Sequence, residues 1–181
     1  YFVASGSLAR GMPVDVYAQI AKKVKERGGR LVLDTSGSPL HWALQAGVWL
    51  VKPSRRELEH LLGRKAQTPA DEEALAREVI DRGQAEIVAL TLGSAGAVLA
   101  TRELTLRLQS PKVETKSVVG AGDSFVGAMT WALAHGQPIE QAFAYAVAAG
   151  AATALTAGTE LCRRADVLRL YAQVAAQLPS T

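Results

Sequence analysis

Several features are scarce in this sequence, and each scarcity excludes a class of protein. There is one cysteine, Cys162, so no internal disulfide forms and the chain is not a disulfide-stapled domain. The three histidines, His41, His60 and His135, lie far apart and lack zinc-type spacing with that cysteine. Neither G-x-x-x-x-G-K-S/T nor G-x-G-x-x-G is present, which excludes a P-loop enzyme and gives no support to a nicotinamide site.

Charge of one sign and long apolar runs are scarce as well. The 20 Lys and Arg residues nearly balance the 17 Asp and Glu residues, so we expect no nucleic-acid partner. The most apolar stretch, residues 142–155, is too short to cross a bilayer, so we expect a buried helix and no membrane partner. A single cysteine also fits a reducing compartment, and we therefore expect a cytoplasmic protein.

The composition itself is that of a folded domain. The 181 residues are 49% hydrophobic and 20% charged, which is enough for one domain with a core. The chain starts at Tyr1, without Met and within a strand pattern. Because a domain rarely begins on its own buried strand, we expect the C-terminal portion of a longer protein.

Short apolar runs alternate with helical patterns along the whole chain. Strand patterns cover residues 1–5, 30–34, 48–51, 86–92, 97–100 and 104–108. Helical patterns cover residues 13–27, 39–46, 58–62, 69–82, 125–134, 139–155 and 166–178. This alternation predicts an α/β fold, a three-layer α/β/α sandwich with a mostly parallel central sheet. The last strand alternates polar and apolar residues, so we expect it to be antiparallel at an edge.

The stretch from Val118 to Ser124 combines a glycine turn with one carboxylate. It leads into a helical pattern and therefore predicts a helix N-terminus, where N–H groups favour an anion. Gly120 and Gly122 permit a positive φ and a close approach to a ligand. Asp123 is the only candidate base beside them, and an anion cradle beside a base is what phosphoryl transfer requires. The same residues also fit a plain turn whose Asp caps the helix.

Other loops at the carboxyl ends of the predicted strands are candidates for ligand contacts. Residues 91–96 offer a hydroxyl, N–H groups and two glycines to phosphates, although alone they fit an ordinary hairpin turn better. Glu57 fits a metal ion held through water and a capping box with Ser54 equally well. Ser7 fits a substrate-binding hydroxyl or a loop serine bonded to the backbone.

The segment from Val119 to Phe125 resembles the G-A-G-D signature of the ribokinase-like (PfkB-type) carbohydrate kinases. Three further motifs resemble that family's and come in its order, namely Ser5-Gly6-Ser7-Leu8, Leu50-Val51-Lys52-Pro53 and Thr91-Leu92-Gly93-Ser94-Ala95-Gly96-Ala97. Residues 127–130 and 158–162 are similar to the minor-isozyme type of 6-phosphofructokinase. The resemblance implies a ribokinase-like fold and an ATP-dependent kinase that converts fructose 6-phosphate to fructose 1,6-bisphosphate in glycolysis. Kinases for fructose 1-phosphate and tagatose 6-phosphate stay open.

The resemblance also implies residue roles. Asp123 corresponds to the catalytic base that contacts the sugar, the turn of Gly120, Ala121 and Gly122 to the anion hole, and Ser7 to a residue facing the phosphosugar. The ATP-binding positions would be Lys52, Ser54, Thr91, Gly93, Gly96, Thr115, Val147 and Ala151. Mg²⁺ would be tied through water to Glu57. Main-chain oxygens would hold a monovalent cation such as K⁺ near Ser117, Val119, Thr153, Thr156 and Gly158.

Two departures from the family pattern stand out. The Asn of the family's N-x-x-E motif is Ser54 here, which caps a helix as well but has a shorter reach and no amide. The family's N-terminal part, with most sugar-binding residues and a dimer-forming β lid, has no counterpart in these residues. We therefore expect residues 1–181 to be the C-terminal nucleotide-binding part of one kinase domain, inactive alone, whose parent is a homodimer. The alternative of another class is a nucleotide-binding chain without catalysis.

Overall fold

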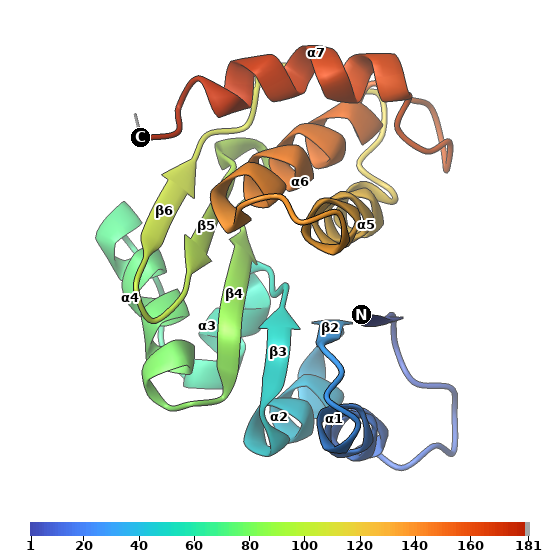
Figure 1. Cartoon of the computed structure of the whole chain (residues 1–181), viewed down its shortest axis with the longest axis vertical. Helices are drawn as coiled ribbons and strands as arrows, with labels where there is room; N and C mark the ends of the chain where they lie inside the picture. The colour runs from blue at the N-terminus through green and yellow to red at the C-terminus, as the bar shows by residue number, and fades with distance from the viewer. Residues whose placement is uncertain (180–181) are drawn as a thin grey trace. The chain divides into compact units, whose positions relative to one another are not determined.

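The computed structural model describes residues 1–179, and over that range the chain forms seven α-helices, one short 3₁₀ helix and six strands. The strands form one sheet in the order β1-β2-β3-β4-β5-β6 (Figure 1). The backbone divides into two compact units, Tyr1–Thr91 with Val98–Leu106, and Leu92–Ala97 with Arg107 onward. Both the α/β class and the mostly parallel sheet predicted from the sequence are confirmed.

Four parallel strands form the centre of the first unit: β1 (Phe2–Ser5), β2 (Leu31–Asp34), β3 (Val48–Val51) and β4 (Ala85–Thr91). The inner strands are nearly continuous runs of buried Val and Leu, as is usual for parallel strands. Because Ser5 pairs with Asp34 and Leu33 with Val51, the strands end together. Their carboxyl ends therefore form a common edge.

The two remaining strands form a hairpin. β5 (Ala97–Ala100) and β6 (Thr105–Leu108) are joined by four residues, closed by Thr101 N donating to Leu104 O at 2.8 Å. So short a connection joins antiparallel neighbours, because parallel strands need a long crossover. β6 ends the strand order, so the predicted antiparallel edge strand is confirmed.

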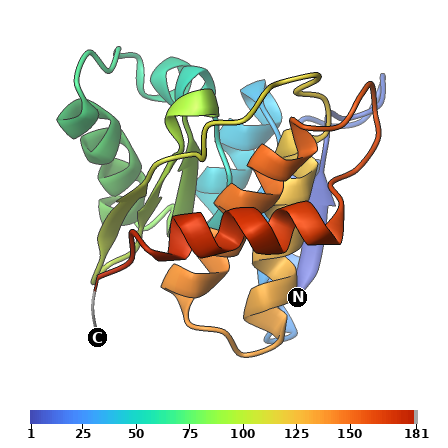
Figure 2. The ribbon, with the colours of Figure 1, turned by 90° about the horizontal axis from the view of Figure 1, so that it is seen from above.

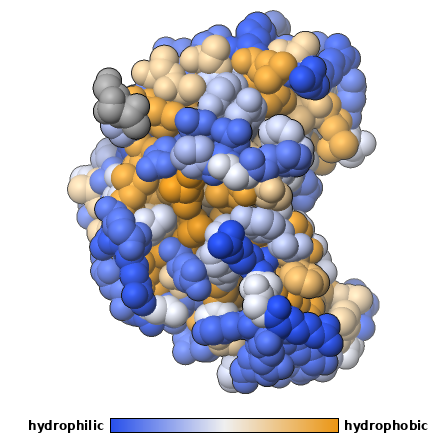
Figure 3. All heavy atoms as spheres, in the orientation of Figure 1, coloured by the Kyte–Doolittle hydropathy of each residue, from blue (hydrophilic) through white to orange (hydrophobic). Residues whose placement is uncertain are grey.

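Helices α1 (Val16–Glu26), α2 (Gly37–Ala46), α3 (Arg55–Leu62) and α4 (Pro69–Asp81) complete the first unit. Figure 3 shows hydrophilic side chains over the outer faces of α1 and α4, as amphipathic helices require. Capping boxes start both α3 and α4, with Ser54 and Thr68 as their first residues. The sequence predicted the first of these boxes and the helices that follow them.

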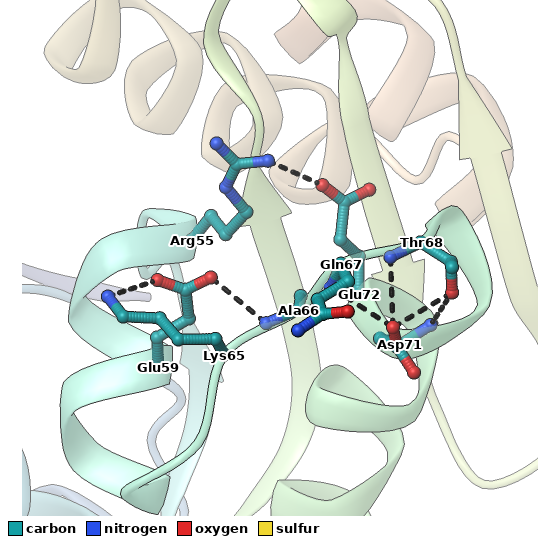
Figure 4. A network of polar contacts seen from close by, with 8 residues as sticks. All are labelled: Arg55, Glu59, Lys65, Ala66, Gln67, Thr68, Asp71 and Glu72. Atoms are coloured by element: carbon teal, nitrogen blue, oxygen red, sulfur yellow. Dashed lines mark hydrogen bonds and ion pairs between the residues drawn. The ribbon is translucent and has the colours of Figure 1, made fainter.

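The link between α3 and α4 is fixed by a buried carboxylate (Figure 4). Glu59 accepts hydrogen bonds from Lys65 Nζ at 2.9 Å and from Ala66 N at 3.0 Å. These bonds, that from Lys65 first, lower the pKa of Glu59 below its ordinary value of 4.5. Bonds from Thr68 and Gln67 likewise lower the pKa of Asp71.

The second unit contains α5 (Ala121–Ala134), α6 (Ile139–Thr153) and α7 (Arg164–Ala175), with α7 packed on α6 (Figure 2). Small residues let α5 and α6 approach closely, since a Cβ at Gly150 would lie 3.4 Å from Ala121 O. Phe125 and Phe143 meet edge to face in the core between these helices. Across residues 1–179 no helix has the length and apolar character needed to cross a membrane.

The start of α5 differs from the prediction. The helix begins at Ala121, whereas the sequence pattern placed its first residue at Phe125. Gly120 takes the left-handed conformation, with φ 78° and ψ −1°, and acts as the N-cap. Gly122 therefore lies inside the first helical turn, so the positive φ predicted for it is wrong.

Candidate active site

A buried lysine lies at the carboxyl edge of the first unit. Lys52 follows β3 and extends the ladder, its N–H donating to Leu33 O at 3.0 Å. Its side chain is only 8% exposed, and Nζ lies 3.1 Å from Asp34 Oδ1 at the end of β2. A buried ammonium needs such a partner. Lys52 was predicted as a site residue and Asp34 was not, although an acid at the end of one strand and a lysine directly after the next were a usable signal.

Glu57 forms the capping box at the start of α3. Its Oε2 accepts from Ser54 N at 2.7 Å, while Ser54 Oγ accepts from Glu57 N at 3.3 Å. Thr91 N donates to Pro53 O at 2.9 Å, which fixes the end of β4 beside this turn. The capping-box alternative is thus confirmed, and the ATP and metal roles of these residues stay predictions.

The loop that follows β1 is held by its neighbours. Gly6 N donates to Asp34 O, and Gly6 O accepts from the hydroxyls of Tyr17 and Thr35, each bond at 2.9 Å. Ser7, next in the chain, has an exposed side chain. A fixed backbone with an exposed hydroxyl suits the substrate-facing role predicted for Ser7.

In the second unit, the glycine turn presents Asp123 at the start of α5. Ser124 N donates to Gly120 O at 2.9 Å and begins the helical ladder. The N–H groups ahead of it, that of Gly122 among them, have no acceptor within the helix. Asp123 is the third residue of α5 and is exposed. An exposed carboxylate therefore stands beside N–H donors at the positive end of a 14-residue helix.

The five residues predicted near a monovalent cation lie close together in this unit. Ser117 Oγ donates to Gly158 O at 2.8 Å and accepts from Val119 N at 3.2 Å. Thr156 Oγ1 lies 2.7 Å from Thr153 O, and both threonine side chains are buried. The bonds tie the segment before α5 to the segment after α6. The cation itself stays a prediction.

The predicted phosphate loop is a tight turn. η1 (Gly93–Ala95) is closed by Leu92 N donating to Gly96 O at 2.9 Å. Gly96 has φ +106°, and a Cβ there would lie 2.0 Å from Leu108 O, whereas Gly93 at φ +62° faces open space. Gly96 is therefore required by the fold, which confirms the hairpin-turn alternative and leaves the ATP role a prediction.

The remaining predicted ATP contacts are also in the second unit. Val147 and Ala151 lie one helical turn apart and buried on α6, and Thr115 is exposed in the segment before α5. The predicted residues thus fall into two groups. Ser7, Lys52, Ser54, Glu57 and Thr91 belong to the first unit, and the others to the second.

In the part of the chain that the structure describes, no three His, Cys, Asp or Glu side chains gather as a metal site. Mg²⁺ in phosphate chemistry usually keeps several waters and takes one or two carboxylates besides the substrate phosphates. Glu57, at the carboxyl edge of the sheet, suits that kind of ligation.

A parallel sheet whose loops gather at one edge, and a glycine-started helix with an acid in its first turn, are both features found in α/β proteins that bind phosphate groups. The chain matches the family described as pfkB family carbohydrate kinase over residues 1–166, and it belongs to that family. The family resemblance drawn from the sequence motifs is confirmed.

Individual relatives agree with this assignment. The chain is 43% identical over 171 residues to the ATP-dependent 6-phosphofructokinase isozyme 2 of Mycobacterium tuberculosis, covering 94% of this chain and 50% of that protein. It is 32% identical over 173 residues to the 1-phosphofructokinase of Borreliella burgdorferi, covering 95% and 55%. The crystal structure of Escherichia coli phosphofructokinase-2 in complex with potassium superposes with a TM-score of 0.91 at 38% identity, covering 96% and 56%. The chain therefore spans about half the length of the curated relatives it matches.

Proposed function

We propose that this chain supplies the nucleotide-binding and base-bearing part of an ATP-dependent phosphosugar kinase. The reaction is the transfer of the γ-phosphoryl group of ATP to a hydroxyl of fructose 6-phosphate, which gives fructose 1,6-bisphosphate. One observation carries the proposal: Asp123 is exposed in the first turn of α5, a helix that begins directly after the left-handed Gly120. Relatives named as 6-phosphofructokinases support the choice of sugar.

The chemistry follows from that turn. The Asp123 carboxylate accepts the proton of the sugar hydroxyl as the hydroxyl oxygen attacks the γ-phosphorus and the bond to ADP breaks. Negative charge on the transferred group is stabilised by the first-turn N–H groups, Gly122 included, and by the helix dipole. Because Gly122 has no side chain, the phosphoryl group can approach the backbone closely.

Residues of the first unit serve the nucleotide in this proposal. The Lys52 ammonium binds ATP phosphate, and its ion pair with Asp34 fixes the direction of the side chain. Glu57 holds Mg²⁺ through water, and the ion, when bound, neutralises charge on the phosphates. In the second unit, the hydroxyls and carbonyls around Ser117 and Thr156 are suited to K⁺. The Escherichia coli phosphofructokinase-2 structure is a complex with potassium.

Two other functions have specific support. Fructose 1-phosphate is the second candidate acceptor, because a 1-phosphofructokinase is among the relatives. Tagatose 6-phosphate is a third candidate acceptor, supported by the motif resemblance alone. A nucleotide-binding chain without turnover is favoured by coverage of only about half of each relative. We also propose that the natural gene product is a cytoplasmic homodimer. Cell fractionation tests its location, and light scattering tests its oligomeric state.

A sugar panel tests the proposal. ATP consumption is measured for the natural gene product and for the 181-residue chain with fructose 6-phosphate, fructose 1-phosphate, tagatose 6-phosphate, fructose and ribose. We expect the highest kcat/KM for the natural product with fructose 6-phosphate. Preference for another sugar contradicts the choice of acceptor. Absence of turnover with every sugar contradicts the proposed kinase activity. Calorimetric titration of the chain with ATP and Mg²⁺ separates a nucleotide-binding chain from one that binds no nucleotide.

A further inference from the structure

A cavity of about 400 Å³, widely open to solvent, lies within the first unit between α2 and α3. That volume is in the range of sites for small molecules. All eight residues that line it come from these helices, namely Gly37, Ser38, Leu40, His41, Arg56, Glu57, His60 and Leu61. Among the residues given a role in the kinase reaction, Glu57 alone is on its wall in the described chain.

Positive charge from α3 faces this cavity. Arg56 is exposed, lines the cavity and forms no ion pair within residues 1–179. Its neighbour Arg55 is directed elsewhere, with a guanidinium nitrogen 3.1 Å from Glu72 Oε1 (Figure 4). His60 is four residues after Arg56 and so lies on the same helix face. Arg56 and His60 therefore present a guanidinium and an imidazole to the same cavity.

The N-terminus of α2 adds hydrogen-bond donors. Gly37 and Ser38 line the cavity, and the N-cap Ser36 makes no side-chain cap bond. The first-turn N–H groups are therefore not satisfied by a cap, and the helix dipole favours negative charge there. At α3 the equivalent groups are already capped, because Glu57 and Ser54 bond to each other.

The remaining wall suits a carbon skeleton with hydroxyl groups. Leu40 is buried and Leu61 is half-buried, which gives an apolar floor. His41 on α2 and His60 on α3 carry ring nitrogens that hydrogen-bond hydroxyls. The Glu57 carboxylate, whose Oε2 accepts from Ser54 N, opposes an anion at its own end of the wall. An inorganic phosphate satisfies only the charged part of this wall.

We propose that this cavity is a binding site for a small phosphorylated polyol or sugar, separate from the ATP site. The phosphoryl group binds the Arg56 guanidinium and the first-turn N–H groups of α2. The carbon chain lies on Leu40 and Leu61, and its hydroxyls bond the rings of His41 and His60. The proposal stands independently of the kinase reaction, because it concerns binding alone.

The three histidines provide a direct test. Ring signals of His41, His60 and His135 are followed by NMR at constant pH while sn-glycerol 3-phosphate is added to the 181-residue chain. We expect saturable shifts of the two cavity histidines with one shared Kd, and none for His135, which follows α5. Arg56→Gln should raise that Kd at least tenfold. Arg55→Gln, the same charge change on a residue outside the cavity, should change it less than twofold.

Several results would overturn the proposal. They are the absence of shifts, equal shifts of all three histidines, and equal effects of the two arginine variants. In a final experiment, the NMR titration is repeated in the presence of saturating Mg²⁺ and a non-hydrolysable ATP analogue. Shifts that persist support a separate site, and shifts that disappear assign the phosphate to the nucleotide site.

Discussion

Lys52 Nζ lies 3.1 Å from Asp34 Oδ1, and the two side chains are only 8% and 19% exposed. Asp34 ends β2 and Lys52 directly follows β3, so the pairing of these two parallel strands sets their distance. An ammonium held in this way keeps further N–H donors for a ligand phosphate. The ion pair thus links the order of the strands to the function proposed for Lys52.

Removing one partner of this pair should be costly. Lys52→Met leaves the Asp34 carboxylate without its lysine, and we expect about 3–5 kcal/mol lower stability in urea unfolding. In an Asp34→Asn background the same change should cost less, with a coupling of about 1–3 kcal/mol. Strictly additive losses in this double-mutant cycle contradict a direct pairing.

Gly96→Ala should disrupt the turn before β5. The added Cβ would lie 2.0 Å from Leu108 O, at a φ of +106°. We expect a loss of about 3 kcal/mol or more, or failure to fold. Gly93→Ala is the matched control: its φ is +62° and the space is open, so the expected cost is about 1–2 kcal/mol. Equal costs for the two variants, measured by chemical unfolding, contradict this account.

Ser54 should be replaceable by the family's asparagine without loss of the helix cap. Ser and Asn cap about equally well, so Ser54→Asn should change the stability by less than about 0.5 kcal/mol. Ser54→Ala should cost about 1 kcal/mol, as should Thr68→Ala in the equivalent box of α4. Thermal unfolding of the three variants checks this. An Asn variant as unstable as the Ala variant shows that the position needs more than a cap.

The contribution of Glu59 should depend on pH. Its folded pKa is lowered by Lys65 and Ala66, so the stabilisation is complete above the ordinary value of 4.5 and is lost as the pH falls through the lowered pKa. Glu59→Gln should therefore lower the urea midpoint at pH 7, and the two proteins should converge in acid. Glu26→Gln, at the exposed end of α1, is the control. A difference that stays constant into the acid range contradicts the assignment.

Local patterns predicted the elements well. The alternation of apolar runs and helical patterns, and the spacing of Ser54 and Glu57, depend on residues close in sequence. The start of α5 was misplaced because the conformation of Gly120, and not the apolar periodicity, decides where the helix begins.

Contacts between distant segments could not be predicted in the same way. Asp34 and Lys52 are both visible in the sequence at strand ends, but their pairing depends on the order of the strands, which local patterns do not give. The requirement for glycine at position 96 comes from the carbonyl of Leu108, in the second strand of the hairpin. The motifs drew attention to Asp123 and its turn because these residues are consecutive in the sequence, but the cavity between α2 and α3 has no such sequence pattern.

In the proposed reaction, Asp123 takes the proton from the sugar hydroxyl. The most direct measurement compares wild type with Asp123→Asn in the natural gene product, for kcat with fructose 6-phosphate and for the Kd of ATP with Mg²⁺. We expect kcat to fall by about 10²–10⁴-fold, because the amide cannot accept the proton, while the Kd changes less than about threefold. A kcat close to that of wild type contradicts the assignment of the base. An equal loss of nucleotide binding indicates instead that the carboxylate supports the fold of the turn.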